Sequence, residues 1–295
     1  MKLKQLIAES VKTVSRCYPE EEAREMVFAY LEYAFGTKKH THIIEPDYEI
    51  PEDGASQAQQ AFDRMASGEP LQYVTGEAYF YGRRFAVTPS VLIPRPETEI
   101  LCQNVLTASG AGRDSRILDL CTGSGCIAWT LALELPGAEA TAVDISEDAL
   151  GVASGQDFSE EISRTEAHKP HFIKADVLAA PMAELGQFDV LTSNPPYVME
   201  SEKALMRRNV LEHEPELALF VADEDPLIFY RAVASWAVGL LKPGGFGIVE
   251  INEALGAETA GVFADAGMTD VNILKDLSGK DRFVSFRKQI PTDAT

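Results

Sequence analysis

The chain has 295 residues, of which 45% are hydrophobic and 24% are charged, as is usual for a globular protein with one large or two modest domains. Its formal net charge of −20 disfavours a protein that grips long nucleic acid, because such proteins gain most of their affinity from basic side chains on phosphates. No apolar run approaches the roughly 20 residues that span a bilayer, and the charged N-terminus, MKLKQLIAESVKTVSR, is not typical of a secretory signal. We therefore expect a cytoplasmic protein without membrane contact. Its four cysteines lack metal-site spacing, so we expect reduced thiols and no metal.

The first 76 residues are predicted to form a small helical domain. Apolar residues recur at helical spacing in its first helix: Leu3, Leu6, Ile7, Val11 and Val14. Two further helical patterns stop at Gly36 and Gly68. Residues 77–95 then contain two runs rich in aromatic and β-branched residues around Tyr81-Gly82-Arg83, a pattern that predicts a β-hairpin linker.

Residues 96–290 are predicted to form an α/β domain, and residues 291–295 a frayed tail. Short apolar strands are expected at 116–120, 138–144, 171–175, 188–193, 246–252, 270–275 and 282–287, with helices between them, as in 127–135 and 226–241. Alternation of this kind gives a mostly parallel sheet with helices on both faces. Ligands in such sheets bind beyond the carboxyl ends of the strands, near the point where the strand order reverses.

A glycine loop, DLCTGSGCIA (119–128), follows the first of these strands. Gly123 and Gly125 let the backbone turn tightly and approach a ligand, and Asp144 ends the next strand, where a carboxylate can accept hydrogen bonds from ribose hydroxyls. Asp119 just before the glycines and Asp176 after the third strand add two carboxylates at the same edge. Three acids would repel a dinucleotide's diphosphate but suit the cationic S-adenosyl-L-methionine, with Asp176 and Val177 expected to meet its adenine.

The motif NPPY, 194–197, follows the fourth strand and therefore falls on the same sheet edge. Neither Pro195 nor Pro196 has an N–H, so this rim presents acceptors without competing donors at two positions. The Asn194 side-chain oxygen and the Pro195 carbonyl are expected to accept from one planar NH2 group, with Tyr197 against its flat face. This arrangement suits methylation of a weakly nucleophilic amide or base nitrogen, because fixed acceptors orient the lone pair and stabilise the charge that grows on nitrogen.

At this point the chain resembles the HemK/PrmC family, the release-factor glutamine N5-methyltransferases. The resemblance rests on NPPY together with PLQYVTGEAYFYGRRFAVTPSVLIPRPETE (70–99), EPELALF (214–220), DPLIFYR (225–231) and LKPGG (241–245). It implies a class I, Rossmann-like methyltransferase domain of seven strands, preceded by a helical domain that helps to recognise the substrate.

The same resemblance implies roles for individual residues. The cofactor-binding set is Asp119, Cys121, Thr122, Gly123, Ser124, Gly125, Asp144, Asp176, Val177 and Asn194. The substrate glutamine would be held by Asn194, Pro195, Pro196 and Tyr197, of which Asn194, Pro195 and Tyr197 are expected to be catalytic. The family commonly has Gly where this chain has Cys121, and a small thiol is expected to be tolerated. The segment around Arg95 and Glu97 is expected to roof the pocket and to tie the two domains together.

The implied substrate is the glutamine of the Gly-Gly-Gln motif in class I peptide chain release factors, with a monomeric enzyme and no direct nucleic-acid partner. Three alternatives remain open from the sequence: an adenine-N6 DNA methyltransferase, a glutamine methyltransferase for a ribosomal protein, and a binding protein that keeps the fold without catalysis. The charge of −20 disfavours the first. The ribosomal-protein enzymes usually carry Ser-Pro after IPR, where this chain has Pro96-Glu97. The intact motifs disfavour the third.

Overall fold

The computed structural model describes residues 1–108, 112 and 114–291. The predicted tail, 291–295, therefore lies outside the described residues from 292 onwards. The described chain forms two compact units: Met1–Glu77 with Met206–His213, and Ala78–Leu205 with the chain from Glu214 onwards. No helix in the described ranges has both the length and the apolar character needed to cross a membrane.

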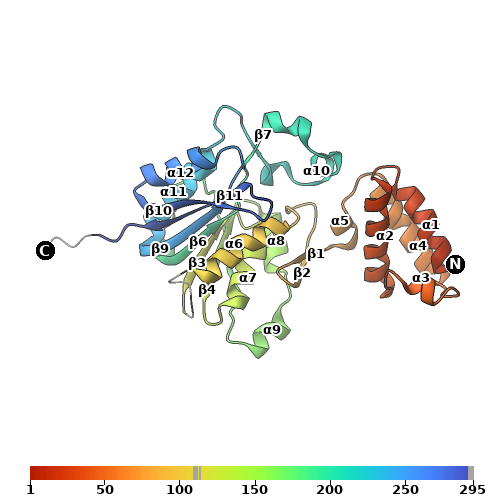
Figure 1. Cartoon of the computed structure of the whole chain (residues 1–295). Helices are drawn as coiled ribbons and strands as arrows, with labels where there is room; N and C mark the ends of the chain where they lie inside the picture. The colour runs from red at the N-terminus through yellow and green to blue at the C-terminus, as the bar shows by residue number, and fades with distance from the viewer. Residues whose placement is uncertain (109–111, 113, 292–295) are drawn as a thin grey trace. The chain divides into compact units, whose positions relative to one another are not determined.

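The first unit is helical (Figure 1). Its helices are α1 (Leu3–Val14), α2 (Glu20–Phe35), α3 (Thr41–Ile44), α4 (Glu52–Ala66), α5 (Leu71–Thr75) and α10 (Arg208–His213). The apolar stripe predicted for α1 is buried and packs against apolar side chains of α2 and α4. Gly36 ends α2 in the left-handed conformation, at φ +66°, which glycine adopts without a steric penalty. Segment 206–213 belongs to this unit although it is distant in sequence: Arg207 Nη1 donates to Glu22 at 2.7 Å.

The predicted hairpin consists of β1 (Glu77–Phe80) and β2 (Arg83–Ala86). Its two turn residues, Tyr81 and Gly82, have positive φ values of +50° and +74°. Two successive positive φ angles match the right-handed twist of the strands, which is why this turn joins antiparallel pairs. Phe80 and Phe85 are fully buried, with ring centroids 6.0 Å apart, so the hairpin is fixed to the core of the second unit.

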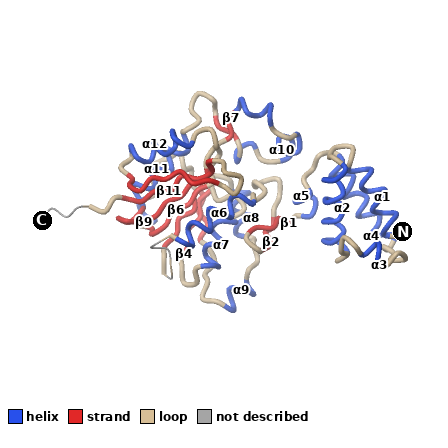
Figure 2. The backbone as a smooth tube through the Cα atoms, in the orientation of Figure 1, coloured by secondary structure: helices blue, strands red, loops and turns tan. Residues whose placement is uncertain are grey.

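The second unit is built on a seven-stranded sheet (Figure 2). Its strands are β3 (Arg116–Leu120), β4 (Glu139–Asp144), β5 (His171–Lys174), β6 (Phe188–Ser193), β9 (Leu241–Glu250), β10 (Met268–Lys275) and β11 (Asp281–Lys288). The spatial order is β10-β11-β9-β6-β3-β4-β5, and only β11 runs antiparallel to its neighbours. The chain proceeds outward from β3 through β4 to β5 and then returns to the other side of β3 as β6. The order therefore reverses between β3 and β6, where open α/β sheets place their ligands.

Both faces of the sheet are covered by helices, which are α6 (Pro96–Thr107), α7 (Cys126–Glu134), α8 (Glu147–Ser154), α9 (Ser159–Arg164), α11 (Ile228–Leu240) and α12 (Gly256–Asp265). Shorter elements are the pair β7 (Val198–Met199) and β8 (Phe220–Val221) and the 3-10 turns η1 (Ala183–Leu185), η2 (Glu200–Leu205) and η3 (Glu216–Ala218). Successive strand residues belong to different core clusters, as Ile117 and Leu118 do, because strand side chains alternate between faces.

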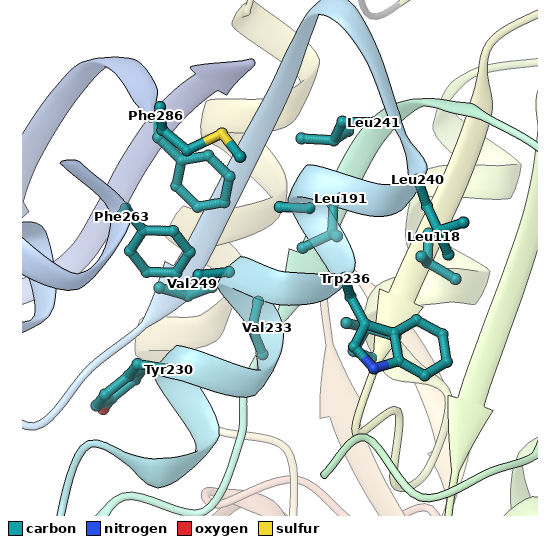
Figure 3. Close-up of a cluster of buried hydrophobic side chains, with 14 of the residues drawn as sticks. Leu118, Leu191, Tyr230, Val233, Trp236, Leu240, Leu241, Val249, Phe263 and Phe286 are labelled. Carbon is teal, nitrogen blue, oxygen red and sulfur yellow. The ribbon is translucent and has the colours of Figure 1, made fainter. Parts of the chain in front are cut away.

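One cluster lies between the sheet and α11, which presents Tyr230, Val233, Trp236 and Leu240 to the strands (Figure 3). The other lies under α6 and α7. The central strands, such as β3 and β6, are thus buried on both faces, whereas the edge strands β5 and β10 are more exposed. The predicted α/β class and mostly parallel sheet are confirmed. Several strand boundaries differ from the expected ones by one or two residues. The largest difference is at β9, which begins at Leu241, the first residue of the LKPGG segment, five positions before the expected start at 246.

Candidate active site

The glycine loop between β3 and α7 adopts a series of left-handed conformations. Cys121, Gly123 and Gly125 have φ angles of +59°, +54° and +79°. The N–H of Thr122 donates to Val143 O at 3.0 Å, and that of Gly125 to Thr122 O at 2.9 Å, so the loop folds back on the sheet edge. A left-handed φ at Cys121 strains a residue with a Cβ, and glycine would adopt it without that strain.

Asp144, the last residue of β4, is held by backbone donors on both oxygens. Its Oδ2 accepts from the N–H of Gly123 at 2.8 Å, and its Oδ1 from that of Ser146 at 3.0 Å. Burial raises the pKa of this carboxyl, and these N–H groups partly offset the rise. The carboxylate is therefore fixed in direction, with lone pairs left for a ligand's hydroxyl groups.

A pocket with a volume of about 310 Å³ lies at this sheet edge, entirely within the second unit. Nine of the residues expected from the sequence line it: Cys121, Thr122, Gly123, Ser124, Asp144, Asp176, Val177, Asn194 and Pro196. The backbone of the segment that contains Asp176 and Val177 is fixed by Trp236, whose indole Nε1 donates to Val177 O at 3.0 Å. Leu178 N donates to Asp176 Oδ1 at 2.8 Å, which orients that carboxylate as well.

Four expected residues, Asp119, Gly125, Pro195 and Tyr197, are not among those that line the pocket. Asp119 is fully buried, and its two oxygens accept from the hydroxyls of Thr122 at 2.5 Å and Thr192 at 2.8 Å. Burial raises the pKa of Asp119 to about 7, and those hydrogen bonds act against the rise. With both oxygens engaged, Asp119 joins the glycine loop to β3 and β6. A direct contact between Asp119 and the cationic cofactor stays a prediction.

The NPPY turn stands beside the glycine loop, as expected from its place after β6. Ser193 pairs with Val249 in parallel register, so Asn194 follows β6 next to the end of β9 at Glu250. Asn194 is half-buried and its Nδ2 donates to Thr98 Oγ1 at 3.4 Å. The Tyr197 hydroxyl donates to Glu250 Oε1 at 2.9 Å.

Pro195 and Pro196 are buried, so the turn is set into the edge of the sheet. Asn194 and Pro196 therefore line the same pocket as the glycine loop and Asp144.

Comparison with known proteins identifies the family. Residues 96–217 match the family described as methyltransferase small domain, and residues 5–76 match the PrmC N-terminal domain. A release factor glutamine methyltransferase of Flavobacterium psychrophilum is 34% identical over 288 residues, which cover 96% of this chain and 98% of that protein. The chain belongs to the release factor glutamine methyltransferase family.

Two further matches have similar names. The release factor glutamine methyltransferase of Bacteroides thetaiotaomicron is 45% identical over 222 residues, 75% of this chain and 77% of that protein. A solved protein-(glutamine-N5) methyltransferase (release factor-specific) from Alicyclobacillus acidocaldarius is 28% identical, covers 70% of this chain and 99% of that chain, and superposes with a TM-score of 0.42. The family resemblance predicted from the motifs is confirmed by the two relatives.

Two segments that lie far apart in the sequence, 93–95 and 214–217, meet at this pocket. Glu214 is buried, and its carboxylate accepts from Arg95 Nη2 at 2.6 Å and from the N–H of Ile93 at 3.3 Å. Arg95, Pro215 and Leu217 line the pocket. Arg95 and Glu214 both lie in the second unit, and Glu97 is exposed. The expectation that Arg95 and Glu97 tie the two domains together stays a prediction.

Several residues at this pocket were not expected from the sequence, and two of them, Thr98 and the neighbouring Glu250, bear on the NPPY turn. Thr98, in the first turn of α6, is buried and lines the pocket, and its hydroxyl donates to Glu250 Oε2 at 2.7 Å. Glu250 is buried at the end of β9. A signal was present: the expected strand at 246–252 contains this acid at the same edge as Asp144, where polar strand-end residues form sites.

Proposed function

We propose that this protein transfers a methyl group from S-adenosyl-L-methionine to the side-chain nitrogen (N5) of the glutamine in the Gly-Gly-Gln motif of class I peptide chain release factors. The observation that carries the proposal is that Asn194 and Asp144 line one pocket, so a cofactor on the glycine loop and an amide on the NPPY turn would be neighbours. Relatives named release factor glutamine methyltransferase, at 34% and 45% identity, support the same activity.

The residues around the glycine loop fit S-adenosyl-L-methionine. Gly123 lines the pocket and an added Cβ there would meet no atom within 4 Å, so the backbone leaves room for a ligand at close approach. Asp144 would accept from the ribose hydroxyls, and Asp176 and Val177 would meet the adenine. When bound, the cofactor supplies an electrophilic methyl group on a positively charged sulfur.

The NPPY turn would position the glutamine amide for attack on that methyl group. The nitrogen lone pair of an amide is delocalised, so the attack needs orientation and charge stabilisation more than a strong base. The Asn194 Oδ1 and the Pro195 carbonyl would each accept one amide N–H. Both would stabilise the positive charge that grows on nitrogen as the new N–C bond forms and the bond between the methyl carbon and sulfur breaks, which would leave a neutral thioether. The proton becomes acidic only after methyl transfer and then leaves to solvent.

The finer assignments are also part of the proposal. The helical unit of residues 1–76 would contribute to recognition of the release factor, residues 77–95 would link it to the catalytic domain of residues 96–290, and the enzyme would act in the cytoplasm as a monomer, without direct contact to nucleic acid. A net charge of −20 would accelerate encounter with a basic partner. In that case the methylation rate falls as ionic strength rises.

The test is transfer of a labelled methyl group to four acceptors: a class I release factor, its Gly-Gly-Gln→Gly-Gly-Ala variant, a ribosomal protein preparation and duplex DNA. Label on the intact release factor alone supports the proposal. Label on duplex DNA supports the adenine-N6 alternative, label on ribosomal protein supports the second glutamine alternative, and no label on any acceptor supports a binding protein.

A matched pair of variants tests the acceptor role of Asn194. Asn194→Ala should lower kcat by about 100-fold or more, the scale on which a preorganised transition-state hydrogen bond contributes, with cofactor affinity nearly unchanged. Asn272→Ala removes an exposed amide from β10 and should leave kcat as it is. Full turnover in the Asn194 variant would refute the role given to this side chain.

A further inference from the structure

A buried carboxylate connects both ends of the NPPY turn. Glu250 accepts the Tyr197 hydroxyl on Oε1 at 2.9 Å and the Thr98 hydroxyl on Oε2 at 2.7 Å. Thr98 Oγ1 in turn accepts from Asn194 Nδ2 at 3.4 Å. Thr98 from α6 and Tyr197 from the turn after β6 thereby meet on one acid at the end of β9, which is itself buried.

The polarity of this chain of hydrogen bonds is set at its buried end. Burial raises the pKa of Glu250, and the hydrogen bonds from the Thr98 and Tyr197 hydroxyls act against the rise because they favour the ionised form. An ionised carboxylate has no proton to donate, so with Glu250 ionised both hydroxyls point their protons at it. The Thr98 oxygen is then left as an acceptor, and the Asn194 group that can satisfy it is the NH2 group. Because a carboxamide is planar with its oxygen and nitrogen on opposite sides, Oδ1 is turned away from Thr98.

We infer that Glu250, acting through Thr98, fixes which way round the Asn194 carboxamide lies, so that the pocket meets an acceptor and not a donor. Glu250 and Thr98 are positioning residues: they act through Asn194 and, on the other branch, through the Tyr197 hydroxyl. A flipped Asn194 would turn its NH2 group toward the NH2 group of a substrate amide, placing donor against donor. This inference rests on the proposed function, since it is the glutamine amide that needs the acceptor.

Three variants separate this role from simple packing. Thr98→Val keeps the shape but removes the acceptor; Thr98→Ser keeps the hydroxyl. Glu250→Gln keeps the shape but adds a donor, so one of the two hydroxyls must reverse, and reversal at Thr98 favours the flipped amide. Thr98→Val and Glu250→Gln should each lower kcat about three- to tenfold, the scale of one neutral hydrogen bond, while Thr98→Ser retains most of it.

Cofactor affinity should stay within about twofold in all three variants. The double variant Thr98→Val/Glu250→Gln should lower kcat little more than Glu250→Gln alone, because both changes break the same chain of hydrogen bonds. Thr259→Val is the matched control: Thr259 is fully buried in α12, and among the described residues its hydroxyl has no hydrogen-bond partner. It should leave kcat unchanged.

Wild-type protein is assayed first, so that two failures are kept apart. If it labels no release-factor glutamine, the proposed function fails. The positioning role of Glu250 and Thr98 is then still tested by NMR of the Asn194 side-chain NH2 signals, which are assigned by their loss in Asn194→Ala. These signals should shift in Thr98→Val and return toward the wild-type positions in Thr98→Ser. If the wild type is active but Thr98→Val keeps full kcat and unshifted signals, the positioning role is overturned. Equal losses in the Val and Ser variants would also overturn it.

Discussion

The backbone N–H of Gly123 donates to Oδ2 of Asp144 at 2.8 Å, and this bond joins the glycine loop after β3 to the end of the neighbouring strand β4. The loop that would receive the methionine part of a cofactor and the carboxylate that would receive its ribose are thus one unit. A change at either residue moves the other. The bond also leaves the carboxylate aimed before any ligand arrives, which reduces the ordering that binding requires.

Replacing Asp144 should therefore weaken cofactor binding. Asp144→Ala removes a charged acceptor for two hydroxyls and should raise the Kd for S-adenosyl-L-methionine about 10- to 100-fold, since hydrogen bonds to charged groups contribute about 1.5–3 kcal/mol. Isothermal titration calorimetry measures the change, with Asp265→Ala, an exposed acid in α12, as the control. An unchanged Kd in Asp144→Ala would remove this residue from the ribose site.

Replacing Gly125 by alanine should mainly lower stability, whereas replacing Gly123 should mainly weaken cofactor binding. A Cβ on Gly125 would lie 3.0 Å from the Ala153 Cβ and 3.1 Å from Trp129 Cδ1, at a φ of +79°. Gly125→Ala should lower the free energy of unfolding by about 2 kcal/mol or more, from left-handed strain and overpacking together. Urea unfolding of the protein without cofactor measures this loss.

Gly123→Ala should act mainly on the ligand. A Cβ there meets nothing within 4 Å, so the fold bears only the left-handed strain of about 1 kcal/mol, while the methyl group takes up room where a cofactor would approach the backbone. The expected pattern is a smaller loss of stability than in Gly125→Ala and a larger rise in cofactor Kd. The reverse order in both measurements would contradict the assignment of Gly123 to the ligand side and Gly125 to the packing side.

The sequence predicted the centre of the sheet well because the central strands are buried on both faces. The expected strands at 116–120 and 188–193 have the same bounds in the structure. The expected start of β9 was wrong because Pro243 and the glycines after it are typical of a turn, whereas here they lie within the strand. Its pairing with β6 absorbs the irregularity through a register shift between Phe188 and Val190.

The site was predictable where a single strand end carries the chemistry, and not where three segments meet. Asp144 ends strand β4 and Asn194 directly follows strand β6, so the rule that ligands bind at the carboxyl edge of the sheet locates both. Thr98 is brought to Glu250 only by the packing of α6 on the sheet, a contact across 152 positions that no local pattern encodes. Asp119 was placed at the correct strand end, but whether its side chain faces the pocket or the core depends on the Thr122 and Thr192 hydroxyls that hold it.

Asp119 should give the protein a measurable pH dependence of stability. Its folded-state pKa is raised to about 7, chiefly by burial, above the usual 3.8. The folded state therefore binds this proton more tightly than the unfolded state, so the contribution of Asp119 is most favourable below about pH 4 and is lost as pH rises to about 7. The loss is about 4 kcal/mol at most.

Asp119→Asn isolates this effect, because asparagine does not titrate. Unfolding free energies of both proteins at pH 5 and pH 8 should show the variant gaining on the wild type as pH rises. The difference between the two proteins cancels the other titrating groups. A difference that is constant with pH would mean that the buried carboxyl has the same pKa folded and unfolded.

Glu214 should control the roof of the pocket through Arg95 and the Ile93 N–H. Glu214→Ala leaves a buried N–H without its acceptor and frees the arginine, so we expect a stability loss of about 1–3 kcal/mol and a raised KM for the release factor. Glu214→Gln keeps an acceptor oxygen and should lose less of both. Glu216→Ala, two positions along and exposed, is the control.

Cofactor Kd should change less than the substrate KM, because the carboxylates that would hold the cofactor lie on the strand side of the pocket. If Glu214→Ala instead weakened cofactor binding alone and left KM unchanged, these segments would belong to the cofactor site and not to the substrate entrance.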